Sequence, residues 1–378
     1  MRAIRKAPGI LSLLSLLLLG CADDKQRIDN DLLPRRTVLF YLATDNNLSG
    51  EIPVRMEELK KAWSGYDGNL LVFHDDRQEP KLWRVRSEDG GDVKVELVRS
   101  YPEMNSASSE VFAQVVNEVK QQFPARGYGL WVFSHGTGWL PSGMYTSPKS
   151  ITIDGNQEME VADMAKAIPD GLFDFIVMEA CYMGSVEVAY ELRNKTKYLV
   201  ASSSEIVAPG YVGVMANIMP KLFTEQPDLV GLAQAFFGYW SSREERVRAA
   251  TVSVVKSSEL DSLARIVRSI NQQDSVISSA ASLQAFNRSS PYLFYDLSDC
   301  IKGVATKSDY DRFCLQLQKS VVYAAATQQF VVGGYGYPIR SHCGLTTYLK
   351  QRQYPILNSA YSKTSWGKMV GGFWHALP

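Results

Sequence analysis

The sequence predicts an α/β fold with a mostly parallel central sheet. Apolar runs with the length of buried strands alternate with stretches of helical periodicity, a pattern typical of strands joined by crossover helices. Within 131–139 and 175–183 such a run ends abruptly on a reactive side chain, His135 and Cys181 respectively. Ligand sites of open α/β sheets lie at the carboxyl ends of the strands, so we expect both side chains at one edge.

The expected elements follow a regular order along the first two thirds of the chain. Apolar or alternating runs predict strands at 37–42, 69–74, 82–85, 93–98, 131–133, 151–153, 175–178, 198–202 and 250–255. Helical patterns fall at 51–63, 108–122, 160–168, 184–193 and 228–241. Asp89-Gly90-Gly91 lies between two of the alternating runs and predicts a β-hairpin.

The pattern changes at about residue 258. Longer helical stretches are expected at 259–275 and 307–328, with a strand at 345–348. We therefore expect a main domain over 36–257 and an α+β extension over 258–378 that packs on it.

The N-terminus has the features of a lipoprotein leader. Arg2, Arg5 and Lys6 precede an apolar stretch at 10–19, which is too short to span a bilayer and has the length of a signal-peptide core. It closes on Leu-Leu-Gly-Cys21, which resembles the bacterial lipobox, whose cysteine becomes the lipid-modified N-terminus.

The predicted leader implies a cellular location. We expect a signal peptide over 1–20, lipidation at Cys21 and a polar tether over 21–35. This predicts a lipid-anchored protein of the bacterial cell envelope, periplasmic or surface-exposed. An ordinary signal peptide that happens to precede a cysteine is the alternative.

Charge and cysteine content exclude several classes of protein. Lys+Arg and Asp+Glu are equal at 40 each in 378 residues, so nothing indicates a nucleic-acid partner. Four further cysteines do not make a disulfide scaffold, although Cys314 could pair with Cys300 or Cys343; burial as small apolar side chains is the commoner case. Without a C-x-x-C or His-rich spacing, no structural zinc is expected.

Cys181 and His135 together suit acyl-transfer chemistry. A thiol next to an imidazole can ionise to a nucleophilic thiolate, and the backbone N–H groups of Gly136 and Cys181 can form an oxyanion hole. Taken singly, a buried cysteine is usually inert and a histidine at a strand end is often a core residue. Their combination with glycines after His135 and an acid two residues before Cys181 favours a cysteine hydrolase.

The motifs around both residues resemble a known family. His135-Gly136-Thr137-Gly138-Trp139 and Glu179-Ala180-Cys181-Tyr182-Met183 are similar to the two signatures of the clostripain family of cysteine peptidases, in the caspase–legumain–gingipain clan. Residues 43–48, 201–205 and 344–348 resemble other motifs of that family. The two signatures lie about 45 residues apart, close to the His-to-Cys separation of caspases.

The resemblance implies a fold, a mechanism and a specificity. It implies a caspase-like three-layer sandwich, a Cys181–His135 dyad and cleavage after Arg or Lys at P1. An S1 pocket for these side chains needs a carboxylate at its base. Glu179 is the first candidate and Glu205 the second, while a structural ion pair is the alternative role for Glu179.

One departure from the family leaves the specificity open. The family typically carries Asp where this chain has Glu179, so the balance between Arg and Lys is not fixed. Legumain-like enzymes carry Glu-Ala-Cys as well, which keeps an Asn-directed pocket open.

The family is often activated by self-cleavage in the loop after the histidine strand. Here that loop is 140–150, it is rich in Pro, Ser and Gly, and Lys149 is its only basic residue. The resemblance therefore predicts self-processing at Lys149–Ser150, the alternative being a plain exposed lysine. Calcium dependence occurs in part of the family, but beyond Asp45, Asp75 and Asp76 no dense acidic loop supports it, so we assign no metal and no cofactor.

These observations predict a membrane-anchored cysteine endopeptidase that acts on proteins or peptides. A non-hydrolytic binding module on the same fold is one alternative. An amidase or transpeptidase that uses the same thiol is another, because acyl-enzyme chemistry is shared.

Overall fold

The computed structural model describes residues 32–144, 153–154, 157–271, 275–277 and 282–375. At its centre is a nine-stranded sheet of order β13-β10-β9-β8-β5-β1-β2-β3-β4. Its strands are β1 (Arg36–Ala43), β2 (Gly68–Asp75), β3 (Lys81–Ser87), β4 (Val93–Ser100), β5 (Gly127–Phe133), β8 (Phe173–Glu179), β9 (Thr196–Ala201), β10 (Thr251–Lys256) and β13 (Val321–Ala326). The five central strands, from β9 to β2, run parallel, and antiparallel strands flank them on both sides.

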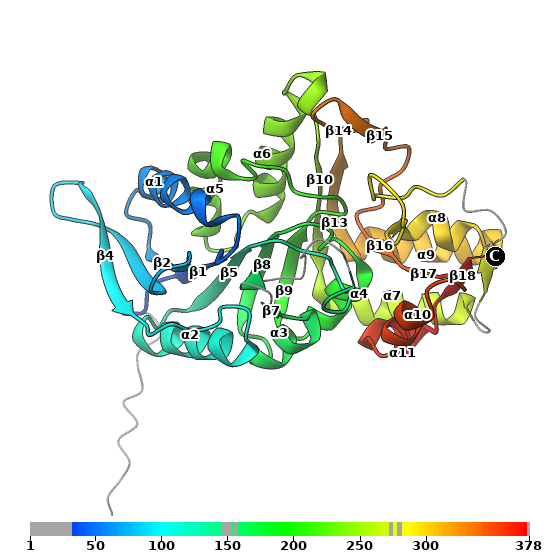
Figure 1. The fold of residues 1–378 in the computed structure, drawn as a ribbon, viewed down its shortest axis with the longest axis horizontal. Helices are drawn as coiled ribbons and strands as arrows, with labels where there is room; N and C mark the ends of the chain where they lie inside the picture. The colour runs from blue at the N-terminus through cyan, green and yellow to red at the C-terminus, as the bar shows by residue number, and fades with distance from the viewer. Residues whose placement is uncertain (1–31, 145–152, 155–156, 272–274, 278–281, 376–378) are drawn as a thin grey trace, which may run out of the picture.

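Helices cover both faces of this sheet (Figure 1). One face carries α1 (Ile52–Ala62), α5 (Met215–Leu222) and α6 (Leu229–Ser241), and the other carries α2 (Ser109–Gln122), α3 (Val161–Ala167), α4 (Val186–Leu192) and α7 (Leu260–Ile270). Strand β1 shows why two layers form. Leu39 and Tyr41 belong to one buried apolar cluster, whereas Val38 and Phe40 belong to the other, because successive side chains of a strand point to opposite faces. The predicted α/β sandwich with a mostly parallel sheet is confirmed.

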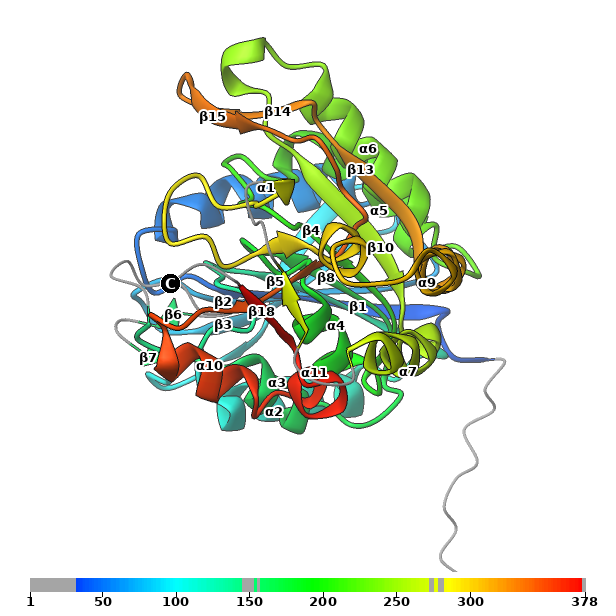
Figure 2. The same cartoon turned by 90° about the vertical axis from the view of Figure 1, so that its right-hand side faces the viewer.

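The C-terminal part contributes helices, short strands and one strand of the main sheet (Figure 2). Its helices are α8 (Leu297–Lys302), α9 (Lys307–Ser320), α10 (Pro355–Tyr361) and α11 (Ser365–Val370). Short strands are β11 (Val276–Ile277), β12 (Tyr295–Asp296), β14 (Gln329–Val332), β15 (Tyr335–Pro338), β16 (Thr346–Thr347), β17 (Leu349–Lys350) and β18 (Phe373–His375), besides β6 (Ile153–Asp154) and β7 (Gln157–Glu158) earlier in the chain. Short 3-10 helices are η2 (Ser49–Glu51), η3 (Val212–Val214), η4 (Glu245–Val247) and η5 (Ser257–Glu259).

The helix expected over 307–328 is wrong in its second half. Helix α9 ends at Ser320, and the following residues form β13, which pairs antiparallel with β10. The run Val321-Val322-Tyr323 is β-branched and aromatic, and the edge of β10 offers it backbone hydrogen bonds. The predicted domain boundary at residue 257 stays a prediction. Strand β13, which lies beyond this boundary, is nevertheless an edge strand of the main sheet.

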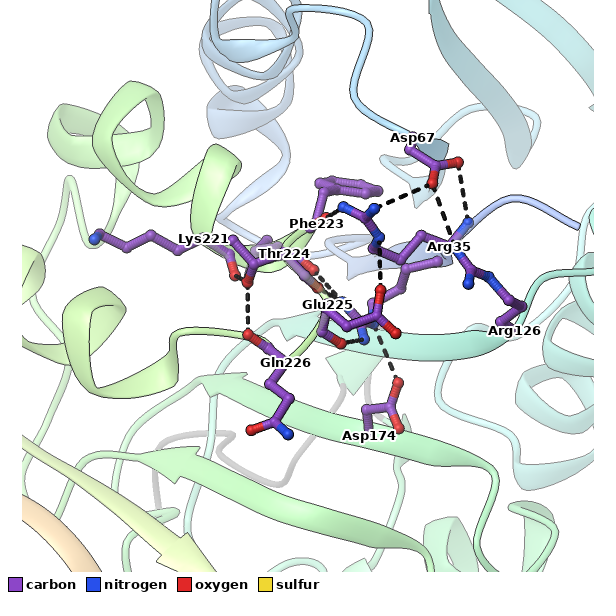
Figure 3. Close-up of polar contacts among 11 residues, drawn as sticks. Arg35, Asp67, Arg126, Asp174, Lys221, Phe223, Thr224, Glu225 and Gln226 are labelled. Carbon is purple, nitrogen blue, oxygen red and sulfur yellow. Dashed lines mark hydrogen bonds and ion pairs between the residues drawn. The ribbon is translucent and has the colours of Figure 1, made fainter. Parts of the chain in front are cut away.

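An ionic cluster holds the amino-terminal ends of the central strands together. Arg36 is 3% exposed, its Nε lies 3.1 Å from Asp174 Oδ2, and its Nη1 donates to the carbonyl oxygens of Leu222 and Thr224. The neighbouring Arg35 contacts Asp67 and Glu225 (Figure 3). These contacts tie the start of β1 to β8 and to the segment between α5 and α6.

Two general features bear on the expected cellular location and on the possible disulfide bonds. No helix among the described residues combines the length and the apolar composition needed to cross a bilayer. The four cysteines in the described part of the chain are free thiols, so Cys314 pairs with neither Cys300 nor Cys343.

Candidate active site

Strands β5 and β8 bring the two predicted reactive residues to one edge of the sheet. Their parallel register pairs Phe133 with Glu179, so His135 and Cys181, each two residues further on, occupy equivalent positions beyond the strand ends. Both side chains line a cavity of about 90 Å³. Its other lining residues are Leu48, Glu51, Arg55, Phe133, Ser134, Glu179, Ala180, Ile206, Val207, Ala208 and Gly210.

A glycine allows the two loops to approach closely. A Cβ at Gly136 would lie 2.6 Å from the carbonyl oxygen of Cys181 and 2.9 Å from its nitrogen, closer than real Cβ atoms come to other groups. Any larger residue would therefore push the histidine loop away from the cysteine loop. The backbones of Gly136 and Cys181 lie in direct contact.

His135 is oriented by a residue that the sequence analysis did not select. Its Nε2 lies 2.6 Å from Oδ1 of Asn47, which follows strand β1. An amide oxygen accepts, so this contact favours the tautomer with the proton on Nε2. Asn47 belongs to the polar run Asp45-Asn46-Asn47 at the end of a buried strand, which was the available sequence signal.

The turn that carries Cys181 is fixed by the loop after β9. Tyr182 has a φ of 60°, in the left-handed region, and its N–H donates to the Ser204 carbonyl at 2.9 Å. Gly184 N–H donates to the Ser202 carbonyl at 2.7 Å. Cys181 itself is partly buried, and its Sγ lies 3.9 Å from the Ile206 carbonyl oxygen. Cys181 thus lines the cavity from a turn whose backbone is held by hydrogen bonds.

Glu179, the first candidate for the base of the S1 pocket, already has protein partners. Its Oε1 accepts from Arg55 Nη1 at 2.9 Å and from the Tyr211 backbone N–H at 3.0 Å. Its Oε2 accepts from Trp131 Nε1 at 2.8 Å. The carboxylate lines the cavity but forms a buried ion pair with Arg55, the alternative that the sequence left open.

Arg55 comes from helix α1 and was not predicted as a site residue. It is 5% exposed, and its guanidinium carbon lies 3.4 Å from the centroid of the Phe133 ring. Its Nη2 is 3.7 Å from a carboxylate oxygen of Glu51, one turn earlier. No sequence pattern links Arg55 to Glu179, 124 residues away.

Glu205, the second candidate, faces another set of partners. Its Oε2 lies 2.6 Å from Arg288 Nε, and its Oε1 accepts from Tyr182 Oη at 3.0 Å. Burial raises the pKa of the Tyr182 hydroxyl well above its usual value, and the negative charge of Glu205 adds to this, so the hydroxyl stays protonated and donates. Among described residues, the loop after β9 contributes Ile206, Val207, Ala208 and Gly210 to the cavity lining, whereas Glu205 is not part of it.

Other predicted positions lie elsewhere. Lys149 and Cys21 fall outside the described residues. Within the described ranges, no group of three His, Cys, Asp or Glu side chains is placed to hold a metal ion, and Asp45 lies 3.7 Å from Arg77.

Comparison with known proteins identifies relatives of this chain. The model of the clostripain family matches residues 40–368. Clostripain of Hathewaya histolytica is 26% identical over 211 residues, with 46% of this chain and 40% of that protein covered. The chain therefore aligns with less than half the length of that relative.

Two solved structures share the fold over most of the chain. An inactive zymogen C11 protease from Parabacteroides distasonis has a TM-score of 0.80 and 33% identity, with 89% of this chain and 98% of that chain covered. A secreted C11 cysteine protease from Bacteroides thetaiotaomicron, in complex with an irreversible peptide inhibitor, has a TM-score of 0.78 and 26% identity, with coverages of 89% and 98%. The expected caspase-like sandwich is confirmed by these relatives.

Proposed function

Because the chain belongs to the clostripain family of cysteine endopeptidases, we propose that Cys181 and His135 form its catalytic dyad. The observation that carries this proposal is their common position on one small cavity, with Gly136 packed on the Cys181 backbone. The thiolate of Cys181 attacks the carbonyl carbon of the scissile peptide bond, and protonated His135 donates its proton to the leaving amine. Water then hydrolyses the thioester and releases the second product.

The tetrahedral intermediates need donors for their negative oxygen. We propose the backbone N–H groups of Gly136 and Cys181, and the close approach of these two residues supports this assignment. Asn47 acts as a positioning residue that orients the His135 ring.

We propose that the substrates are proteins or peptides with Arg or Lys at P1. The cavity lining contains two carboxylates, from Glu51 and Glu179, and one guanidinium, from Arg55, so its fixed side-chain charge favours a cation over an anion. Glu205 is the second proposed S1 acid. Since it lies outside the cavity lining, we expect Glu205→Gln to change P1 selectivity less than Glu179→Gln.

One assay tests the proposed reaction. The purified protein and its Cys181→Ala variant are compared on fluorogenic peptides that vary only at P1, with Arg, Lys, Asn and norleucine. We expect hydrolysis that disappears in Cys181→Ala, with the highest kcat/KM for Arg or Lys. Hydrolysis of no peptide would refute the peptidase, whereas cleavage after Asn alone would refute only the basic pocket.

Self-activation is proposed at the Lys149–Ser150 bond. The similarity to a zymogen C11 protease supports a precursor that needs processing. Mass spectrometry of the purified protein should show a cut after Lys149 that is missing in Cys181→Ala. A fully active and uncut enzyme would contradict this proposal.

The proposed cellular location is the bacterial cell envelope, with a lipid anchor attached to Cys21. Related C11 proteases include a secreted protein, which supports export but leaves the anchor to be tested. Metabolic labelling with radioactive palmitate should mark the wild type and leave Cys21→Ala unlabelled. Equal labelling of both would refute lipidation at Cys21.

A further inference from the structure

Arg55 places a guanidinium group in the cavity lining, and a substrate with arginine at P1 would bring the same group. A P1 arginine would place a guanidinium next to the buried carboxylate at the base of the pocket. Arg55 already does so, with Nη1 at 2.9 Å from Glu179 Oε1. Both residues line the same cavity as Cys181 and His135.

The position of Arg55 is fixed by more than this ion pair. Its guanidinium stacks over Phe133, the last residue of β5, with 3.4 Å between the guanidinium carbon and the ring centroid. The residue is 5% exposed and lies in the first turn of α1, whose buried face packs against the sheet. A cation held by a helix, an aromatic ring and a buried carboxylate is not readily displaced by an incoming side chain.

The two acids of the cavity differ in what they can offer a substrate. The Glu179 side chain is 0% exposed and accepts from Arg55, Trp131 and the Tyr211 backbone, whereas the Glu51 side chain is 29% exposed. Glu51 is 3.7 Å from Arg55, a longer and weaker contact. It is therefore the better placed carboxylate for an incoming cation.

We propose that Arg55 determines the P1 specificity of this enzyme. It neutralises Glu179 and so weakens the preference for Arg and Lys over neutral side chains, and it leaves Glu51 as the carboxylate that receives a P1 cation. This inference rests on the proposed peptidase activity and defines the substrate class of that same site.

The test measures selectivity instead of absolute activity. The quantity is the ratio of kcat/KM for a P1-Arg peptide to kcat/KM for the matching P1-norleucine peptide. Both values come from one preparation, so the fraction of folded enzyme cancels. We expect Arg55→Met to raise the ratio roughly 10- to 100-fold, the range of one hydrogen bond to a charged group, and Arg55→Lys to stay near the wild type. An unchanged or lower ratio in Arg55→Met would overturn the proposal.

A second variant keeps the proposal testable if Arg55→Met does not fold, because that change leaves Glu179 without its counter-ion. Glu51→Gln keeps the Arg55–Glu179 pair, and we expect it to lower the ratio about 10-fold or more. An unchanged ratio would show that Glu51 does not receive the cation and would refute the account.

Two controls separate the possible failures. Arg36→Met removes a comparably buried arginine at the opposite edge of the sheet, and its selectivity ratio should equal that of the wild type. If the wild-type protein shows no Cys181-dependent hydrolysis, the proposed function itself is refuted. If it hydrolyses peptides but the selectivity ratio of the variants is unchanged, only the role of Arg55 is refuted.

Discussion

Strand β8 carries a partly buried acid near its amino-terminal end and a fully buried one at its carboxyl end, and both acids pair with an arginine from the N-terminal part of the chain. At the amino-terminal end, Asp174 pairs with Arg36 in a cluster that ties three segments together. At the carboxyl end, Glu179 pairs with Arg55 two residues before Cys181. The pairs are alike in chemistry but differ in their surroundings.

We infer from this difference that the Arg36–Asp174 pair is structural, whereas the Arg55–Glu179 pair bears on function. Arg36 has three backbone carbonyl acceptors besides Asp174, so its hydrogen-bonding capacity is used to join segments of the fold. Arg55 instead lies on a cavity with a thiol and an imidazole. The carboxyl ends of parallel strands open into loops, and loops can place several reactive groups around one space. The Arg36–Asp174 ion pair at the amino-terminal edge therefore contributes to stability alone.

The largest effect is expected at the carboxyl edge, for His135→Ala. Without the imidazole the leaving amine is not protonated, and kcat/KM should fall by about 10³-fold or more. The free energy of unfolding should change by less than about 1 kcal/mol, because His135 is partly exposed. Peptide hydrolysis and urea unfolding measure the two quantities; activity within 10-fold of the wild type would remove His135 from the mechanism.

Gly136→Ala tests the contact between the two loops. The added Cβ would come within 2.6 Å of the Cys181 carbonyl oxygen, so the loops must separate and the proposed oxyanion donors move apart. We expect a loss of about 10²-fold in kcat, the size seen when one oxyanion donor is removed. Gly143→Ala is a matched control, since a Cβ there meets nothing within 4 Å, although its φ of 73° makes some strain unavoidable. Equal losses in both variants would contradict the account.

At the amino-terminal edge, Asp174→Ala should affect stability alone. It leaves buried Arg36 without its carboxylate and should lower the free energy of unfolding by about 2 kcal/mol, less than a fully buried pair because Asp174 is 15% exposed. The selectivity ratio for P1 should not change. A shifted ratio would show that the two edges are coupled and would break the comparison.

Glu187 sharpens the comparison because it is a buried carboxylate that accepts from Thr347 Oγ1 and the Tyr348 N–H instead of from an arginine. Burial raises the pKa of Glu187 from 4.5 to about 7. The folded protein therefore holds a proton that the unfolded chain loses, and the free energy of unfolding falls as the pH rises from about 4.5 to about 7.

Glu187→Gln should remove this part of the pH dependence. We expect the variant to equal the wild type near pH 4.5 and to exceed its free energy of unfolding at pH 8 by about 1 to 2 kcal/mol. Urea unfolding at both pH values measures the difference. A variant that is less stable than the wild type at pH 8 would contradict the assignment of a protonated Glu187.

The sequence was sufficient to predict those residues of the candidate site that lie directly after a strand end. His135 and Cys181 each come two residues after the end of a buried strand, and a parallel register brings such positions together. Arg55 could not be found in this way, and the polar run after β1 did not show that Asn47 would be the residue that contacts His135. Their roles depend on how helix α1 and the loop after β1 pack against other strands, and a local pattern does not encode that packing.

The same distinction explains the fold. Periodicity predicted the central strands and most of the helices on both faces, because burial of one or two faces of an element sets the spacing of its apolar residues. It missed helix α5 (Met215–Leu222). It failed at Ser320, where helix α9 gives way to β13, since the signal that ends the helix is an available sheet edge far along the chain. Tertiary pairing decided between two conformations that the local sequence allowed.

The most direct test of the central claim is covalent labelling with a peptidyl ketone that alkylates an activated thiol. Intact-mass and peptide-mass analysis should show one inhibitor per chain, attached to Cys181, with much slower labelling of His135→Ala and none of Cys181→Ala. Attachment to Cys314 or Cys343, or equal rates in the wild type and His135→Ala, would contradict a thiol and an imidazole that act together at the ends of β8 and β5.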